Sequence, residues 1–139
     1  MPNHIYETYK PEGFHTLSSY LIVDNPAELI DFLKNAFYAL EMDRTLHPTT
    51  NEISNCILKI GDSCFMVSQA REPFLAMKTS FYLFVNDVDL MHQRALEFGA
   101  TSVFEPQVMP YEDYQSGVMD TSGNYWWISK RLVEKGYVE

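Results

Sequence analysis

The sequence predicts an α+β protein built from two copies of a β-α-β-β-β module. The stretches YLIVDNPAELIDFLKNAFYALE, from Tyr20, and YLFVNDVDLMHQRALEFGAT, from Tyr82, each read as an apolar strand, an Asn/Asp break and an amphipathic helix. The same offset of 62 residues carries the turn Gly61-Asp62 onto Gly123-Asn124, and SCFMVS onto YWWISK. Agreement in two separate segments predicts an internal repeat that fills the chain.

We expect one helix at residues 26–38 and a second at residues 87–98. Pro26 is favoured at the start of a helix, and Gly99 is favoured just past the end of one. Each segment carries an apolar stripe at helical spacing, which indicates packing against the core. The stripes consist of Leu29, Ile30, Leu33 and Phe37 in the first helix and of Leu90, Met91, Ala95 and Phe98 in the second.

The hairpins follow the two-residue period of β-strands. Around the turn Gly61-Asp62, one face of the hairpin is expected to carry Cys56, Leu58, Ile60, Ser63, Phe65 and Val67. The offset of 62 puts Tyr125, Trp127 and Ser129 on the corresponding face, and Trp126 and Ile128 on the other. The two tryptophans of the chain therefore point to opposite faces of their strand.

The domain organisation follows from the repeat. We expect a single domain at residues 14–132, with modules at about 14–72 and 76–132, preceded by a loosely held tail at residues 1–13. Hydrophobic residues make up 46 % of the chain and charged residues 21 %, which is the composition of a packed globule rather than of a disordered chain.

Charge and cysteine content limit the partners and the location. A net charge of -9 repels nucleic acid and anionic membrane surfaces, so neither is an expected partner. No apolar run approaches the roughly 18 residues of a membrane span. Cys56 and Cys64 form no CxxC pair, and no secretory leader is recognisable, which favours free thiols in a cytoplasmic protein.

The repeated phrases, together with DTSGNYWWISK, resemble the glyoxalase, bleomycin-resistance and extradiol-dioxygenase superfamily, the vicinal oxygen chelate proteins. Within it the likeness is to the PhnB-like branch, whose last strand reads Asp-Pro-x-Gly-x-x-Trp-x-Ile. The resemblance covers about residues 14–132 and departs from that pattern at Thr121, where the branch usually has Pro. It implies two curved sheets around a shared cleft, and commonly a homodimer.

The resemblance also gives positions for a metal site. Metal-dependent members place a His or Glu on the first and last strand of each module, which here correspond to Ser18, Phe65, Ser80 and Trp127. None of these side chains supplies an imidazole or a carboxylate, so we expect no metal and no cofactor. The four histidines, His4, His15, His47 and His92, have no carboxylate at ligand spacing and read as surface or core residues.

The expected cleft is lined by aromatic and hydroxyl side chains. If Ser18 and Ser80 face it, the strand period adds their same-face neighbours. The predicted ligand-binding residues are Ser18, Tyr20, Phe65, Ser80, Tyr82, Tyr125 and Trp127. Such a surface suits a small aromatic or cationic molecule. The segment PYEDYQSG, residues 110–117, reads as a solvated loop or as a cover over the opening.

Three functions stay open at this point. The first is metal-free binding of a small molecule in an aromatic cleft, as in the drug-sequestering members of the superfamily. The second is a lyase or dioxygenase, metal-dependent or metal-free, although no nucleophile motif, phosphate loop or zinc cysteine set identifies a catalytic residue. The third is an assembly domain whose cleft is filled by Trp127.

Overall fold

The computed structural model describes residues 2–138 and contains the two predicted modules. The first module consists of β1 (Tyr20–Val23), α1 (Pro26–Phe37), β2 (Leu40–Leu46), β3 (Ile53–Ile60) and β4 (Ser63–Gln69). The second consists of β5 (Ser80–Phe84), α2 (Val88–Glu97), β6 (Thr101–Val108), β7 (Asp113–Met119) and β8 (Tyr125–Arg131). The sheets have the orders β1-β4-β3-β2 and β5-β8-β7-β6, with β1 and β5 each parallel to their neighbour. The predicted fold class is therefore confirmed. Tyr20 is the first residue of β1, and Tyr82 lies in the corresponding strand β5.

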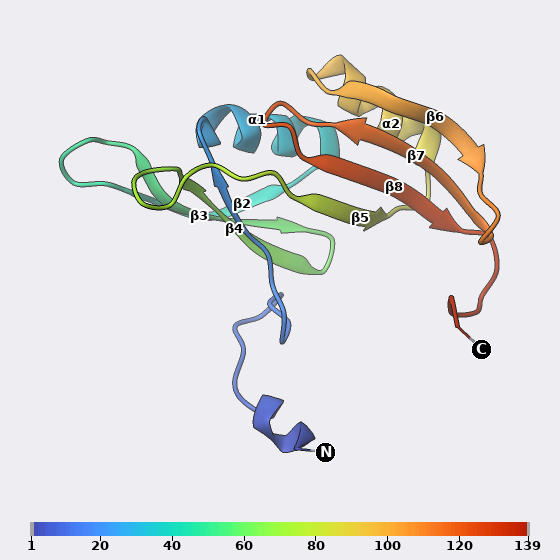
Figure 1. The fold of residues 1–139 in the computed structure, drawn as a ribbon, viewed down its shortest axis with the longest axis horizontal. Helices are drawn as coiled ribbons and strands as arrows, with labels where there is room; N and C mark the ends of the chain where they lie inside the picture. The colour runs from blue at the N-terminus through green and yellow to red at the C-terminus, as the bar shows by residue number, and fades with distance from the viewer. Residues whose placement is uncertain (1, 139) are drawn as a thin grey trace.

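The two modules lie side by side, with α1 and α2 on one side of the molecule (Figure 1). The two helices also contact each other. Each sheet therefore has one face covered by helix and one open face. A short 3-10 helix, η1 (Asn3–Tyr6), and an extended segment precede β1 and run away from the sheets (Figure 1). The end of this segment is fixed to β4, because the amide of Cys64 donates to the carbonyl of Gly13 at 2.8 Å.

Both helices begin and end as predicted, to within one residue. Side chains cap their first turns: Asn25 accepts from the amide of Glu28 at 3.3 Å, and Asp87 accepts from that of Leu90 at 3.0 Å. The stripe of α1 is buried as expected. In α2 the prediction was wrong for two residues, since Leu90 and Phe98 are exposed. Neither helix has the length that a membrane crossing requires, and no other helix among residues 2–138 does.

Trp126 joins the two modules in one core. Its ring stacks on Phe81 of β5 at 4.3 Å between centroids and lies 5.0 Å from Phe37 of α1. The indole N–H donates to Asp120 at 2.8 Å, and the same carboxylate accepts from the backbone amides of Ser122 and Asn124. The phrase DTSGNYW is thus a structural motif, in which Asp120 shapes the turn and anchors the core indole.

The position of Phe65 is corrected by the structure. β1 pairs Tyr20 with Met66, whereas β5 pairs Tyr82 with Trp127, so the counterpart of Trp127 is Met66 and that of Trp126 is Phe65. The offset is 62 residues from β1 to β5 but only 60 from β3 to β7, where Leu58 corresponds to Val118, because residues 109–112 form a shorter connection than residues 47–52. The longer last turn restores one residue, so the offset of the last strand is 61. Phe65 consequently faces the helix side and is buried.

Most of residues 110–117 form a strand and not the expected solvated loop or cover. β7 begins at Asp113, so only residues 109–112 connect it to β6. The polar residues Asp113, Gln115 and Ser116 are buried within the strand. These polar residues made the sequence look like a loop. They can be buried because each has a hydrogen-bond partner inside the fold, which the sequence alone does not show.

Candidate functional site

The predicted ligand-binding residues do not line one cleft. Ser80, Tyr82, Tyr125 and Trp127 lie together on the open face of the second sheet. Tyr20 lies on the open face of the first sheet and lines a different cavity. Phe65 is buried against the core, but together with Ser18 and Tyr82 it lines a further cavity of about 320 Å³ between the two modules. Ser18 precedes β1, where its hydroxyl hydrogen-bonds the backbone of His15. The second sheet therefore carries most of the predicted site.

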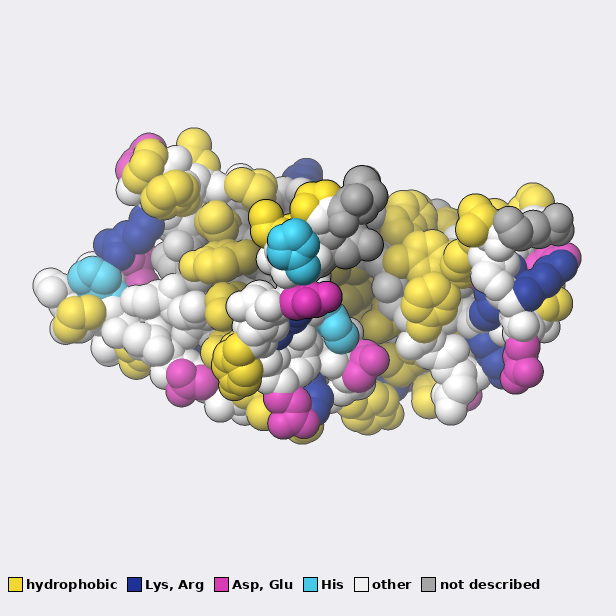
Figure 2. Space-filling model, turned by 90° about the horizontal axis from the view of Figure 1, so that it is seen from below, with side chains coloured by type: hydrophobic (Ala, Val, Ile, Leu, Met, Phe, Trp, Pro, Cys, Tyr) yellow, Lys and Arg dark blue, Asp and Glu magenta, His cyan; other side chains and the backbone are white. Residues whose placement is uncertain are grey.

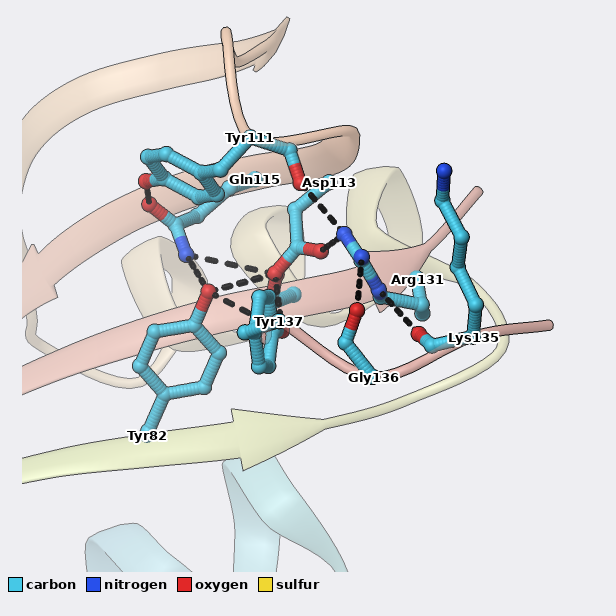
Figure 3. Close-up of polar contacts among 9 residues, drawn as sticks. Tyr82, Tyr111, Asp113, Gln115, Arg131, Lys135, Gly136 and Tyr137 are labelled. Carbon is cyan, nitrogen blue, oxygen red and sulfur yellow. Dashed lines mark hydrogen bonds and ion pairs between the residues drawn. The ribbon is translucent and has the colours of Figure 1, made fainter. Parts of the chain in front are cut away.

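A buried carboxylate, Asp113 of β7, organises this open face (Figure 3). The side chain is fully inaccessible to solvent. Its Oδ2 accepts hydrogen bonds from Ser129 Oγ and Tyr137 Oη, each at 2.6 Å, and from Tyr82 Oη. Gln115 Nε2 donates to Tyr82 Oη at 2.6 Å and so fixes the same phenol from the other side.

The hydrogen bonds keep this carboxylate ionised. Burial raises the pKa of Asp113, but donation from Ser129, Tyr137, Tyr82 and Arg131 outweighs burial and lowers the pKa from 3.8 to about 2. Burial and the bond to the carboxylate raise the pKa of Tyr137, which therefore stays a neutral phenol. The centre of the site is one anion surrounded by neutral donors and one guanidinium.

Arg131 of β8 holds the segment that follows it against the site (Figure 3). Its Nη1 lies 3.1 Å from Asp113 Oδ1 and also donates to the carbonyl of Tyr111. Its Nε and Nη2 donate to the carbonyls of Lys135 and Gly136, each at 3.0 Å, and the guanidinium lies over the ring of Tyr137. Every nitrogen of Arg131 is thus engaged within the protein.

Beside this network lies an open cavity with aromatic walls. It has a volume of about 480 Å³ and is lined by Tyr82, Phe84, Tyr111 and Tyr137. Tyr82 is 5.1 Å from Phe84 and 6.4 Å from Tyr137 between ring centroids, and Tyr111 donates to Gln115. We call these four side chains the aromatic cage. Hydrogen bonds fix three of the four rings, so the cage is present before any ligand binds.

Trp127 lies beside the cage rather than in its wall. Its ring stacks between Phe104 and Tyr125, each at 5.9 Å, and its N–H donates to Ser80 Oγ at 2.7 Å. The rings lie close over Gly117 of β7, where an added Cβ would approach Phe104 to 2.7 Å and Trp127 to 3.1 Å. A side chain at residue 117 would therefore push the two rings off the sheet.

The residues present do not fit the metal site of metal-dependent superfamily members. The corrected register replaces Phe65 by Met66, and a thioether, two serines and an indole supply no set of imidazole and carboxylate ligands. Among residues 2–138 no three His, Cys, Asp or Glu side chains gather as a metal site would require. Asp113 is enclosed by its own hydrogen-bond donors within the protein.

Sequence reasoning missed Asp113, Gln115, Ser129 and Tyr137 as parts of the site. The strand period could have found Ser129, since it follows Tyr125 and Trp127 on the same face. Asp113 and Gln115 were hidden by the loop assignment of residues 110–117. No sequence signal indicates that Tyr137 folds back onto the sheet, because this contact depends on Arg131.

Proteins of mycobacteria are similar to this chain in sequence. An uncharacterized protein of Mycobacterium bovis is 30% identical over 129 residues, covering 85% of this chain and 84% of its own. The chain belongs to the same family as this mycobacterial protein. Two further family members, from strains of Mycobacterium tuberculosis, are equally similar and are also uncharacterized. No family model matches the sequence.

Solved structures show the same fold. The structure of TioX from Micromonospora has a TM-score of 0.70 at 24% identity, covering 84% of this chain and 98% of its own. A glyoxalase/bleomycin resistance protein/dioxygenase family enzyme from Burkholderia phytofirmans has a TM-score of 0.67 at 18% identity, with coverages of 84% and 97%. The PhnB protein from Bacillus cereus has a TM-score of 0.63 at 12% identity, with coverages of 84% and 99%. The fold is that of the glyoxalase/bleomycin-resistance structures, as the resemblance in the sequence implied.

Proposed function

We propose that the protein binds a small aromatic or cationic molecule in the aromatic cage, without a metal. The observation that carries this proposal is the set of four aromatic side chains around an open cavity of about 480 Å³. Ring faces attract flat apolar groups and cations, and each cation–π contact contributes about 0.5 to 2 kcal/mol. The superfamily fold supports the general class, since it hosts binding proteins as well as enzymes.

The charge distribution favours a cation over an anion. Tyr82 and Tyr137 donate to the ionised Asp113, which increases the electron density of their rings. Arg131 lies beside the cage, and four of its five N–H groups already donate within the protein. Its guanidinium is therefore largely occupied, and the net charge of -9 repels an anionic ligand at long range.

Tryptophan fluorescence tests the proposal. We expect a flat aromatic cation such as N-methylquinolinium to change the emission of Trp127, and naphthalene-2-sulfonate to change it far less. Trp126→Phe should keep this response, because Trp126 is on the helix side, whereas Trp127→Phe should lose it while calorimetry still detects binding. Equal responses to cation and anion, or no response to either, would show that the cage is not a selective site.

Elemental analysis distinguishes a metal-free binding protein from a metal-dependent enzyme. We expect the purified protein to contain no stoichiometric Zn, Ni, Fe or Mn, because Met66, Trp127 and the two serines offer no ligand set for them. About one metal ion per chain, with an activity that chelation removes, would replace the present proposal by a lyase or dioxygenase. A protein that binds neither metal nor any probe would favour a domain that serves assembly alone.

Two further properties belong to the same proposal. We infer a homodimer, which the family resemblance implies and which the exposed apolar side chains on both halves of the molecule support (Figure 2). Light scattering after gel filtration would give twice the chain mass of 16.1 kDa. We also infer a cytoplasmic location, which is supported by Cys56 and Cys64 being free and buried.

A further inference from the structure

A second cavity, distinct from the aromatic cage, lies on the open face of the first sheet. Its volume is about 430 Å³. The strands β1, β3 and β4 form its floor, and the segments that follow β2 and β4 form its rim. The lining residues are Tyr20, Ile22, His47, Glu52, Ile53, Ser54, Ser68, Gln69, Arg71 and Phe74. We call this space the first-sheet cavity.

The polar groups on the floor of the first-sheet cavity already have hydrogen-bond partners within the protein. Ser68 Oγ lies 2.8 Å from Tyr20 Oη and 2.8 Å from the carbonyl of Ser54, so these groups satisfy one another. Ile22 and Ile53 supply apolar surface beside them. The floor therefore favours the apolar part of a ligand.

One wall is held in place by the backbone. Arg71 and Phe74 exchange two backbone hydrogen bonds, at 2.9 and 2.6 Å, so their side chains leave the same tight turn at the mouth of the cavity. The ring of Phe74 is largely exposed although it is apolar. A flat ring that enters between Phe74 and Tyr20 would cover both.

The mouth presents N–H donors. His47 Nδ1 accepts from the backbone amides of Thr49 and Thr50, both at 3.2 Å, so the neutral ring carries its proton on Nε2. Within residues 2–138, Nε2 has no hydrogen-bond partner. Arg71 meets Glu52 at 3.8 Å, which is too long for a hydrogen bond, and its side chain is about half exposed. His47 Nε2 is therefore free to bind an oxygen anion. Arg71 already forms an ion pair with Glu52, which lines the same cavity, so its guanidinium would bind a ligand carboxylate beside or in place of that of Glu52.

We propose that the first-sheet cavity binds a small flat apolar molecule that carries a carboxylate. The ring lies between Tyr20 and Phe74, over the isoleucine floor, and the carboxylate accepts hydrogen bonds from Arg71 and from His47 Nε2. Arg suits this role because its planar donors match a carboxylate. This site has the opposite charge preference from the aromatic cage and does not depend on it.

Nuclear magnetic resonance with naphthalene-2-carboxylate and its neutral amide tests the site. Naphthoate should shift the backbone amides of residues 47, 54, 68 and 71, and should bind at least about tenfold more tightly than naphthamide, since a charge-assisted hydrogen bond is roughly twice as strong as a neutral one. Arg71→Gln should remove that preference and leave naphthamide binding unchanged. Arg44→Gln is the matched control, because Arg44 is on the same sheet but pairs with Glu41 beside α1.

Three outcomes would overturn the proposal. The first is equal affinity for naphthoate and naphthamide in the wild-type protein. The second is an equal effect of Arg71→Gln and Arg44→Gln on naphthoate binding. The third is a set of shifts confined to β5, β7 and β8, which would place the carboxylate at the other sheet.

Discussion

Replacing Trp126 by Ala should lower the free energy of unfolding by about 3 to 5 kcal/mol, the usual cost of truncating a large core aromatic. The indole is 3% exposed and connects β5 to α1 across the boundary between the modules. Its loss also leaves Asp120 without one of its donors. Chemical denaturation followed by circular dichroism measures the change.

Trp127→Ala is the control, because it removes the same side chain from the neighbouring position. Trp127 lies on the open face, where Phe104 and Tyr125 cover it only in part. We expect a clearly smaller loss of stability than for Trp126→Ala. A larger loss would mean that Trp127 holds the second module together, and that the indoles have the reverse of the roles assigned here.

Replacing Asp113 by Ala should cost a similar amount, about 3 to 5 kcal/mol, since removing one partner of a buried ion pair leaves the other uncompensated. Three hydroxyl groups and Arg131 donate to this carboxylate. Without it, Arg131 and the phenols of Tyr82 and Tyr137 lose their common acceptor. The cage should lose its fixed rings as well, so binding of an aromatic cation should weaken even where the variant remains folded.

Asp43→Ala is the matched control for Asp113, because Asp43 is an exposed aspartate on β2. It removes one negative charge without breaking a buried contact, so we expect a change within about 0.5 kcal/mol. Denaturation curves of the two variants should separate widely. Curves that coincide would show that the network around Asp113 is dispensable for folding.

The fold could be predicted from sequence because the chain repeats itself. The offset between Tyr20 and Tyr82 predicted the repeated β-α-β-β-β order, and both helices were correct to within one residue at each end. The register of the last strands could not be obtained in this way. A single fixed offset cannot represent connections of different length. The connection between β6 and β7 is shorter than that between β2 and β3, and the last turn is longer, so Phe65 was assigned to the wrong face.

The site was less predictable than the fold because its key group is polar and buried. Periodicity finds apolar stripes, but Asp113 and Gln115 are buried polar side chains on the open face of the sheet, and only hydrogen-bond partners from other strands make their burial favourable. The same limit applies to His92, which was read as a surface or core residue and which α2 buries between Ser116 and Ser102. The partners come from β6, β7 and β8, and their proximity follows only from the folded sheet.

Residue-level mapping of cation binding tests the aromatic cage most directly. A backbone amide spectrum titrated with N-methylquinolinium should show saturable shifts at Tyr82, Phe84, Tyr111 and Asp113, with the amides of β1 to β4 unchanged. This result is expected because the cage is confined to the second module. Shifts that fall mainly on the first sheet, or no shifts at millimolar probe, would mean that the second sheet carries no binding site for an aromatic cation.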